Sequence, residues 1–337
     1  MATYRDAGVD LDAADAVVDR IKAAVTRTWH EGVIGGFGGF AAGITIPTGY
    51  KNPVLMMSTD GVGTKAELAR QTRRFDGLGW DLVAMCIDDL VAAGTRPIAM
   101  TDYVAVGRID IDVVSTIVRS VAAACEQAGV ALLGGETAEH PGVMDADAFD
   151  LAGAALGVVE ADAVIDGSAI RPGDVVIGIE SPNLRSNGFS FVRMLLKQSD
   201  AFARDFADPD GDTAATLLEP SVLYTPAVLA LLETVDVHGL AHVTGGGLPG
   251  NLPRILPDGC GTTIDTSTWT PPPMFTALGD MSGADRAELF RTFNMGIGFA
   301  VMVPSNQAAE AVGVIETAGR SAAVIGHIEA RSGVRLA

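Results

Sequence analysis

The feature that most constrains the fold is a regular alternation of apolar segments with amphipathic ones. The run PVLMMSTDGVGTK (53–65) is typical of an apolar strand that enters a glycine turn, and residues 76–94 are typical of a helix ending at Gly94. Residues 130–142 are typical of a strand that enters a polar turn, and residues 241–256 of a strand, a glycine loop and the start of a helix. We therefore predict an α/β chain of the α+β two-domain kind.

The length of the chain supports two domains. Its 337 residues exceed what a single hydrophobic core usually organises. A stretch rich in Gly, Pro and polar residues, DGSAIRPGD (166–174), interrupts the alternation. We place the boundary there, with an N-terminal domain over 1–165 and a C-terminal domain over 166–337.

Composition and charge argue against several classes of function. The net charge is −19, which is the reverse of the basic excess of a nucleic-acid surface. No run reaches the roughly 18 to 20 apolar residues of a membrane span, and the first residues do not resemble a secretion signal. Cys86, Cys125 and Cys260 lack CxxC spacing, so we expect neither structural zinc nor a disulfide scaffold. These observations predict a cytoplasmic protein that binds neither nucleic acid nor membrane.

A glycine-rich segment, IGGFGGFAAG, is the first candidate site. Gly35, Gly36, Gly38 and Gly39 are interrupted only by Phe37. Such glycines let several backbone N–H groups point at one anion and let the backbone approach a phosphate closely. A mobile surface loop or a set of tight turns would need the same residues, so this segment alone supports both interpretations.

Acidic residues in the N-terminal half suggest a metal site. Asp60 and Lys65 follow an apolar strand in STDGVGTK, where the carboxylate could hold a hard cation and the lysine a phosphate. Asp88 and Asp89 are adjacent on a predicted apolar helix, where a bound cation would offset their repulsion. Glu136 follows the strand in LLGGETAEHPG. The alternatives are an ordinary Asp-Gly turn, a solvated helix face and an acid at a helix start.

Two loops in the C-terminal half are candidate anion sites. Each lies between a predicted strand and a predicted helix, and the second contains three consecutive glycines beside His242. The alternative for these glycines is a loop that passes under another backbone segment. The residues are Ser186, Asn187 and Gly188 in the first loop and Thr244, Gly245, Gly246 and Gly247 in the second.

In this order, the motifs resemble those of the phosphoribosylformylglycinamidine cyclo-ligase family, the aminoimidazole ribonucleotide synthetases of purine biosynthesis. The resemblance covers nearly the whole chain, and it is the ordered set that is specific. The segments are YRDAGVDLDA, GGFGGF, STDGVGTK, WDLVAMCIDDLVAAG, LLGGETAEHPG, SNGFS, LLEPSVLY, HVTGGGLPGNLPRILP and TFNMGIG.

The resemblance implies a fold, a reaction and a set of partners. It implies an N-terminal ATP-binding domain whose sheet joins that of a second copy in a homodimer, and a C-terminal α/β domain that completes the substrate site. The implied reaction is the ATP-dependent cyclisation of formylglycinamidine ribonucleotide to 5-aminoimidazole ribonucleotide, with release of ADP and phosphate. Mg²⁺ is implied as a cofactor, often with K⁺.

The resemblance also implies residue roles. ATP would contact Gly35 to Gly39, Asp60, Thr64 and Lys65, and the substrate would contact Ser186 to Gly188, Thr244 to Gly247 and Asn294. The implied metal ligands are Asp60, Asp88, Asp89 and Glu136, and the implied catalytic residues are Lys65, Arg185 and His242.

One position departs from the family pattern. Arg185 stands where the family usually has a histidine before Ser-Asn-Gly. Arginine keeps a positive charge but cannot shuttle a proton near neutral pH. The sequence therefore leaves two alternatives to the cyclo-ligase. One is a different enzyme of the superfamily, such as a thiamine-phosphate kinase, a selenophosphate synthetase or a hydrogenase-maturation protein, and the other is a non-catalytic nucleotide-binding paralogue.

Overall fold

The computed structural model describes residues 4–207 and 212–337, which form two compact units. Unit 1 contains residues up to Leu90 together with Arg96–Ala161 and Leu218–Leu223, and unit 2 contains the remainder. The division after Ala161 lies close to the boundary predicted after residue 165. The two short segments Val91–Thr95 and Leu218–Leu223 belong to the opposite unit from their chain neighbours, which sequence spacing did not indicate.

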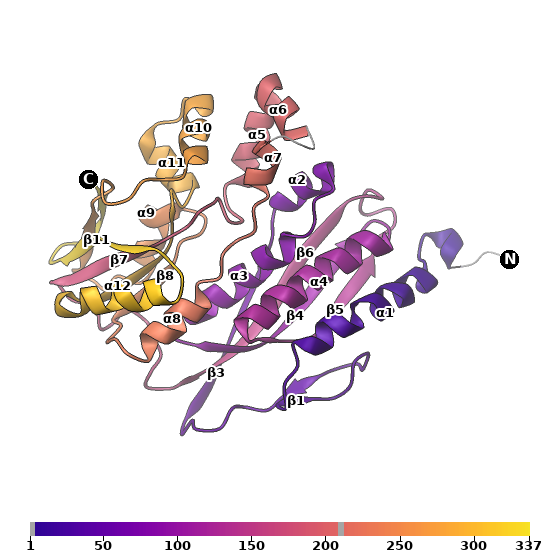
Figure 1. Cartoon of the computed structure of the whole chain (residues 1–337), viewed down its shortest axis with the longest axis horizontal. Coiled ribbons are helices and arrows are strands. Elements are labelled where there is room, and N and C mark those ends of the chain that lie inside the picture. Colours follow the sequence, from indigo (N-terminus) through magenta and orange to yellow (C-terminus); the bar gives the residue numbers. More distant parts are fainter. Residues whose placement is uncertain (1–3, 208–211) are drawn as a thin grey trace. The chain divides into compact units, whose positions relative to one another are not determined.

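Unit 1 is built on a four-stranded mixed sheet (Figure 1). The strand order is β3-β6-β4-β5, in which β4 and β5 are parallel and the other pairs are antiparallel. Alternate residues of β3 are exposed and half-buried, so one face of this strand is covered and the other is open. The strands are β3 (Pro53–Gly61), β4 (Arg96–Val106), β5 (Ala131–Glu139) and β6 (Phe149–Glu160).

The helices of unit 1 begin and end at residues with clear capping roles. Asp10 and Asp110 accept backbone hydrogen bonds at the starts of α1 and α4, and Gly129 ends α4 in the left-handed conformation. At Gly79 a Cβ atom would lie 2.0 Å from the Val121 nitrogen, so only glycine lets α3 lie this close to α4. The helices are α1 (Leu11–Arg27), α2 (Lys65–Thr72), α3 (Leu78–Val91) and α4 (Ile111–Ala128), after a 3₁₀ turn at Arg5–Ala7.

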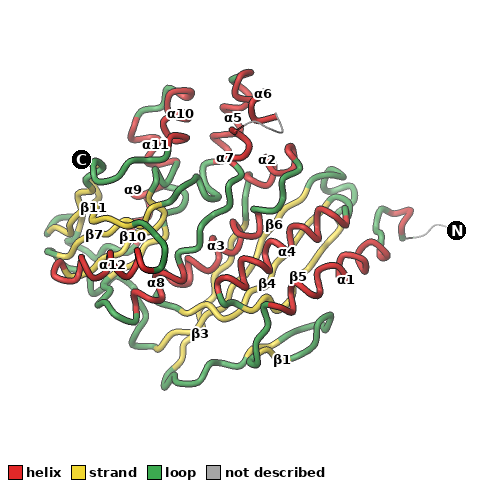
Figure 2. The backbone as a smooth tube through the Cα atoms, viewed as in Figure 1, coloured by secondary structure: helices red, strands yellow, loops and turns green. Residues whose placement is uncertain are grey.

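A small hairpin carries the glycine-rich segment. Strands β1 (Val33–Ile34) and β2 (Gly43–Ile44) pair antiparallel, and residues 35–42 form the loop between them. Figure 2 shows the loop extending from these two short strands. Ile44 of β2 packs against the buried residues Ile98 and Ala99 of β4 and Val158 of β6. The loop is therefore attached at both ends by backbone pairing.

Unit 2 is built on a six-stranded sheet of order β12-β9-β11-β7-β10-β8, in which only β12 and β9 are parallel among the described strands. Strands β7 and β10 are almost fully buried, as their continuous apolar sequences require. The strands are β7 (Asp174–Glu180), β8 (Gly239–His242), β9 (Gly261–Ile264), β10 (Ile297–Pro304), β11 (Ala322–Glu329) and β12 (Gly333–Leu336).

Eight helices of unit 2 are described, and most are short. They are α5 (Phe189–Gln198), α6 (Asp200–Ala207), α7 (Asp212–Leu217), α8 (Thr225–Leu232), α9 (Gly247–Asn251), α10 (Pro273–Ser282), α11 (Arg286–Thr292) and α12 (Ala308–Thr317), with 3₁₀ turns at Leu252–Arg254 and Ser305–Gln307. The mixed α/β two-domain class predicted from the sequence is confirmed. The strand at 53–61 and the helix within 76–94 are confirmed as β3 and α3.

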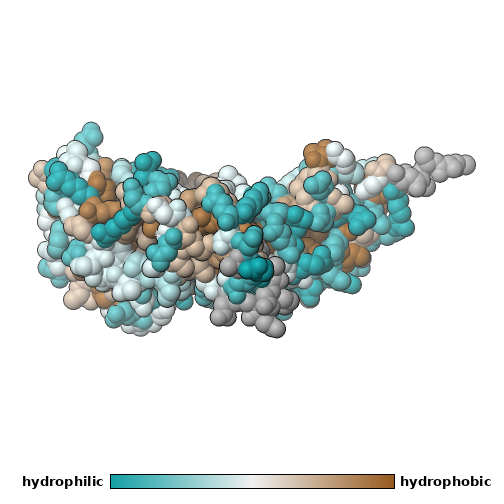
Figure 3. Space-filling view, turned by 90° about the horizontal axis from the view of Figure 1, so that it is seen from above, coloured by the Kyte–Doolittle hydropathy of each residue, from teal (hydrophilic) through white to brown (hydrophobic). Residues whose placement is uncertain are grey.

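The surface is mainly hydrophilic. In Figure 3 hydrophilic residues cover most of the visible face, with apolar residues gathered in small groups between them. This distribution agrees with the large negative net charge of the chain. Within residues 4–207 and 212–337, no helix has both the length and the apolar character needed to cross a bilayer.

Candidate functional site

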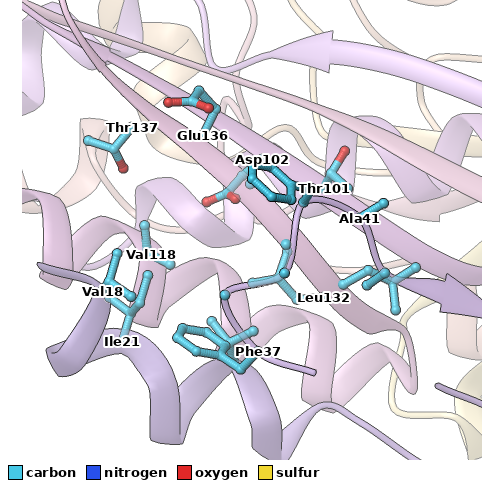
Figure 4. Close-up of a pocket in the computed structure, with 18 of the residues that line it drawn as sticks. Val18, Ile21, Phe37, Ala41, Thr101, Asp102, Val118, Leu132, Glu136 and Thr137 are labelled. Carbon is cyan, nitrogen blue, oxygen red and sulfur yellow. The ribbon is translucent and has the colours of Figure 1, made fainter. Parts of the chain in front are cut away.

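Unit 1 contains a cavity of about 630 Å³. Its walls come from α1, the loop between β1 and β2, β4, β5 and one turn of α4 (Figure 4). Two motifs that are a hundred residues apart in the sequence, GGFGGF and LLGGETAEHPG, line this one space. The lining residues are Ala14, Val17, Val18, Ile21, Val25, Gly36 to Ala42, Thr101, Asp102, Val118 and Leu132 to Thr137.

The glycine loop has a backbone that a ligand can approach closely. Gly35 and Gly38 have φ values of 108° and 83°, which disfavour any other residue. A Cβ atom at Gly36 or Gly38 would meet no atom within 4 Å, so the loop leaves open space beside these two positions. Phe40 at the loop tip is fully exposed. Gly36, Phe37, Gly38 and Gly39 all line the cavity, as the predicted phosphate-binding role requires, and that role stays a prediction.

Asp102 is the residue of the cavity that sequence reasoning missed. It is only 8% exposed, and its Oδ2 atom makes no hydrogen bond within the described part of the chain. Burial raises the pKa of this carboxyl from 3.8 to about 7. The signal in the sequence was a single acid inside the apolar strand IAMTDYVAV, which is an unusual place for an unpaired charge.

The sheet register places Asp102 in one row with Asp60. Asp60 of β3 and Asp102 of β4 both pair with Gly153 of β6, and Asp102 also pairs with Gly135 of β5. Neighbours across a sheet project to the same face, so the two carboxyl groups lie on one face, two strand spacings or roughly 10 Å apart. Glycines occupy the other two positions of the row, because a Cβ atom would lie 2.6 Å from the Met100 side chain at Gly153 and 1.7 Å from Asp102 Oδ1 at Gly135.

The predicted metal ligands do not form one group. Within residues 4–207 and 212–337, no cluster of three or more His, Cys, Asp or Glu side chains could hold a metal ion. Glu136 lines the cavity, whereas Asp88 is fully buried on α3. Asp60 and Asp89 both act on Cys86, because burial raises the pKa of its thiol to about 12 and the negative charges of these two acids add to the increase.

Two carboxylates are sufficient for one kind of ion. Mg²⁺ is usually held by one or two protein carboxylates and completes its octahedral shell with water and substrate phosphates. Asp60, at the end of β3, accepts a hydrogen bond from the Gly61 N–H at 2.7 Å, and Asp89 is exposed on α3. The metal-binding role of the four predicted ligands stays a prediction.

Lys65 lies in a buried ion pair. Its Nζ atom is 2.7 Å from Asp81 Oδ2 and donates to the carbonyl oxygen of Glu219 at 2.8 Å, and neither charged side chain is exposed. Asp81 also accepts from the N–H and hydroxyl of Ser221. Burial raises the pKa of Asp81, while the Lys65 charge opposes the increase. This network fixes the turn DGVGTK to α3 and to the segment 218–223, and the predicted phosphate contact of Lys65 stays a prediction.

In unit 2 the two predicted anion loops lie side by side. A Cβ atom at Gly245 would be 3.6 Å from Asn187 Oδ1, which shows how closely the loops approach. Ser186 Oγ is buried and makes no hydrogen bond within the described residues.

Thr64, which was predicted to contact ATP, lies in unit 1 just before α2. Its side chain is exposed, and its predicted contact with ATP stays a prediction.

Packing explains part of the glycine run. A Cβ atom at Gly247 would lie 1.9 Å from the Phe290 carbonyl oxygen, so this glycine lets the loop pass under another backbone segment. The helix that follows, α9, has five residues, too few to contribute a useful dipole. Asn251 holds the loop instead, because its amide donates to the carbonyls of Thr244, Gly245 and Gly247 at 3.3, 3.2 and 2.9 Å.

Arg185 and His242 are in contact. Arg185 is fully buried in the left-handed region at φ 58°, its guanidinium carbon lies 4.5 Å from the centre of the Tyr224 ring, and its Nη2 is 3.0 Å from His242 Nε2. Because a guanidinium only donates, His242 Nε2 must be the acceptor, which places the imidazole proton on Nδ1. The two predicted catalytic side chains of unit 2 therefore form one hydrogen-bonded pair.

Asn294 supports the neighbouring loop. Its amide nitrogen donates to the Asn183 carbonyl oxygen at 2.9 Å, and its oxygen accepts from the N–H of Gly296 at 2.8 Å. The side chain is 3% exposed. Its hydrogen bonds therefore position the segment that precedes Arg185, while the predicted substrate contact stays a prediction.

Comparison with family models identifies both halves of the chain. Residues 38–159 match the N-terminal domain of AIR synthase related proteins, and residues 171–337 match the C-terminal domain of the same proteins. The chain belongs to the AIR synthase related proteins. The N-terminal match includes β3 to β6, and with them most of the residues that line the cavity.

Solved structures share the fold of this AIR synthase related protein. A thiamine-monophosphate kinase from Stenotrophomonas maltophilia K279a matches with a TM-score of 0.71 at 21% identity, covering 95% of each chain. The hydrogenase maturation protein HypE in complex with ATP matches at 0.68 and 20%, covering 94% of this chain and 90% of that one. T. maritima PurL with AMPPCP matches at 0.58 and 17%, covering 97% of this chain and 48% of that one.

The buried ion pair leads to a stability prediction. Lys65→Met should lower the free energy of unfolding by about 3–5 kcal/mol, because it leaves the Asp81 charge buried without its cationic partner. Lys65→Met combined with Asp81→Asn should recover most of that loss. Urea denaturation measures both, with Lys51→Met, an exposed lysine, as the control. A loss below about 1 kcal/mol in the single variant would show that the pair does not stabilise the fold.

Asp102 leads to a prediction about pH. Its pKa rises from 3.8 to about 7 on folding, so the fold favours the neutral carboxyl. This contribution is complete below about pH 4, decreases as the pH rises, and is lost above about pH 7. Asp102→Asn is neutral throughout, so its stability advantage over the native chain should grow by about 4 kcal/mol between those limits.

The measurement is thermal or urea unfolding of both proteins at a series of pH values. Asp150→Asn replaces an exposed acid on β6 and should show no such pH-dependent difference. The prediction would be contradicted if the difference in stability between Asp102→Asn and the native chain stayed constant with pH.

Proposed function

We propose that this protein is an ATP-dependent cyclo-ligase that converts formylglycinamidine ribonucleotide to 5-aminoimidazole ribonucleotide. The observation that carries the proposal is that GGFGGF and LLGGETAEHPG line one cavity in the unit that matches the N-terminal family domain. The second of these motifs, together with HVTGGG, is the part of the sequence that favours the cyclo-ligase over the other enzymes of the superfamily. Purine biosynthesis is the pathway that this reaction serves.

The proposed reaction has two steps. The formyl oxygen of the substrate attacks the γ-phosphorus of ATP, and ADP leaves. The neighbouring amine nitrogen then attacks the activated carbon, phosphate leaves with the former formyl oxygen, and loss of a proton completes the ring. Such chemistry depends on positioning and charge neutralisation more than on a strong protein nucleophile.

In this proposal unit 1 holds ATP. The N–H groups of Gly35 to Gly39 bind and enclose the phosphates, with Thr64 as a further contact. Asp60 and Asp89 would hold Mg²⁺, which supplies positive charge to the phosphates when bound. These donors overcome the unfavourable field of a chain whose net charge is −19. A requirement for K⁺ rests on the family resemblance alone.

Unit 2 would bind the phosphoribosyl group. The loops 186–188 and 244–247 present backbone N–H groups and small polar side chains, and Arg185 adds a permanent positive charge beside them. His242 accepts a hydrogen bond from Arg185, which places the imidazole proton on Nδ1. Arginine at position 185 therefore suits a role in binding an anion and orienting His242, rather than in transferring a proton.

A product assay tests the proposed function. Purified protein with ATP, Mg²⁺, K⁺ and formylglycinamidine ribonucleotide should release ADP and aminoimidazole ribonucleotide in equal amounts. Asp60→Asn should reduce turnover at least about a hundredfold, because the Mg²⁺ ion that neutralises the phosphate charge would lose one of its ligands. Asp150→Asn should leave turnover unchanged. ADP formed with thiamine monophosphate instead would favour the kinase suggested by the structural likeness to that enzyme. Binding of ATP without either product would favour a non-catalytic paralogue.

The homodimer is a further part of the proposal. Strand β3 is an edge strand of its sheet, and on the open face it exposes Leu55 and Met57, with 48% and 74% of their surfaces accessible. Tyr103 of β4 is exposed on the same face. A long edge strand with apolar residues is a natural pairing surface, so we propose that two copies join here.

Substitution on this face tests the dimer. Light scattering should give twice the chain mass of 34.7 kDa for the native protein. Met57→Lys places a charge on the open face and should shift the population toward monomer, whereas Met194→Lys on α5 should not. A native protein that is monomeric at micromolar concentration would contradict this part of the proposal.

A further inference from the structure

Asp102 is the buried ionisable group of the cavity that the proposed function leaves without a role. The chain makes room for it, because a Cβ atom at Gly135 would lie 1.7 Å from Asp102 Oδ1. Its Oδ2 makes no hydrogen bond within the described residues. An unpaired carboxyl in such a place costs stability unless a ligand supplies the missing partner. The missing partner therefore indicates that Asp102 binds a ligand.

The surroundings of Asp102 define which ligand would fit. Figure 4 shows its carboxyl group among apolar side chains that include Val118 and Leu132, with Thr137 nearby. The cavity walls contain no Lys, Arg or His among the described residues. A flat, uncharged ring with polar atoms at one edge satisfies both conditions, since its faces pack on the walls and its edge reaches the carboxyl.

The ionisable groups around Asp102 come from several elements. Glu136 comes from β5, and Cys125 of α4 is close enough for the Asp102 charge to raise the pKa of its thiol. The glycine loop supplies no ionisable group to the cavity, and on α1 Lys22 lies over the Phe37 ring, 5.9 Å from its centre. Burial therefore favours the neutral form of Asp102.

We propose that Asp102 recognises the amino edge of the adenine base of ATP within this cavity. A neutral carboxyl offers an O–H donor next to a C=O acceptor. Adenine presents the complementary pair, the N1 acceptor beside the 6-amino donor, so two parallel hydrogen bonds form. Guanine presents two donors at N1 and the 2-amino group, which match an ionised carboxylate instead. The protonation state of Asp102 thus selects the base.

The position of Asp102 agrees with the rest of the site. It lies roughly 10 Å along the sheet row from Asp60, the proposed metal ligand. The glycine loop borders the same cavity and is attached only at its ends. The inference rests on the proposed function in one respect, namely that unit 1 binds ATP.

Calorimetric titration tests the inference with three ligands. ATP, GTP and purine riboside triphosphate, which lacks the 6-amino group, are each titrated with Mg²⁺ into the native chain, Asp102→Asn, Asp102→Ala and the control Asp150→Asn. The native chain and the control should bind ATP about tenfold or more tightly than purine riboside triphosphate. Asp102→Asn should keep this preference, because an amide also pairs one donor with one acceptor.

Asp102→Ala should bind ATP and purine riboside triphosphate equally, and its loss of affinity should be smaller for the latter, which pairs with Asp102 through N1 alone. Circular dichroism establishes that each variant is folded. An equal loss of affinity for both ligands in Asp102→Ala would assign Asp102 a packing role and overturn the inference. So would an unchanged ATP preference in that variant, or a preference of the native chain for GTP.

The outcome is separable from that of the proposed function. ATP preference that depends on Asp102 in a protein that forms no aminoimidazole product would support the inference and reject the cyclo-ligase. Product formation without the Asp102-dependent preference for ATP would support the cyclo-ligase and reject the inference. A folded native chain that binds none of the three nucleotides would overturn both.

Discussion

The register of the four-stranded sheet is the constraint on which the candidate site depends. It aligns Asp60, Gly153, Asp102 and Gly135 across four strands, so that two carboxyl groups project to one face with glycine beside each. A shift of one residue in either strand would turn its carboxyl to the other face. The buried pair of Lys65 and Asp81 holds the turn that follows β3, and thereby the end of the strand that carries Asp60.

The same arrangement explains how an acidic chain could bind an anionic nucleotide. The protein places no cation in the cavity wall among its described residues and offers backbone N–H groups at a glycine loop instead. The carboxylates near β3 would then meet the phosphates through a divalent ion, while the buried carboxyl farther along the row is best kept neutral. In this account three acids of similar chemistry take different roles because their burial differs.

Local patterns predicted much of the fold and part of the site. The strand at 53–61 and the helix within 76–94 followed from apolar periodicity and from glycines at turns. Short elements such as β1, β2, β9 and β12 were not predicted, because strands of two to four residues depend on tertiary pairing and show little periodicity. The burial of Lys65 was equally hidden, since its partner Asp81 lies on another helix.

Roles within the candidate site were harder to predict than their locations. Gly247 is required by the Phe290 backbone and Asn294 by a neighbouring loop, and neither contact can be read from a linear motif. Asp88 and Asp89 are adjacent in sequence, yet the helix buries one and exposes the other. The importance of Asp102 depends on an absent hydrogen bond, which only a three-dimensional structure can reveal.

A crystal structure with Mg²⁺ and a non-hydrolysable ATP analogue tests the central claim most directly, because the claim concerns where each part of the nucleotide binds. The account predicts the base in the cavity with its amino edge at Asp102, the phosphates beneath Gly35 to Gly39, and the metal on Asp60 and Asp89. Nucleotide bound with its base outside the cavity, or with its phosphates away from the glycine loop, would contradict it.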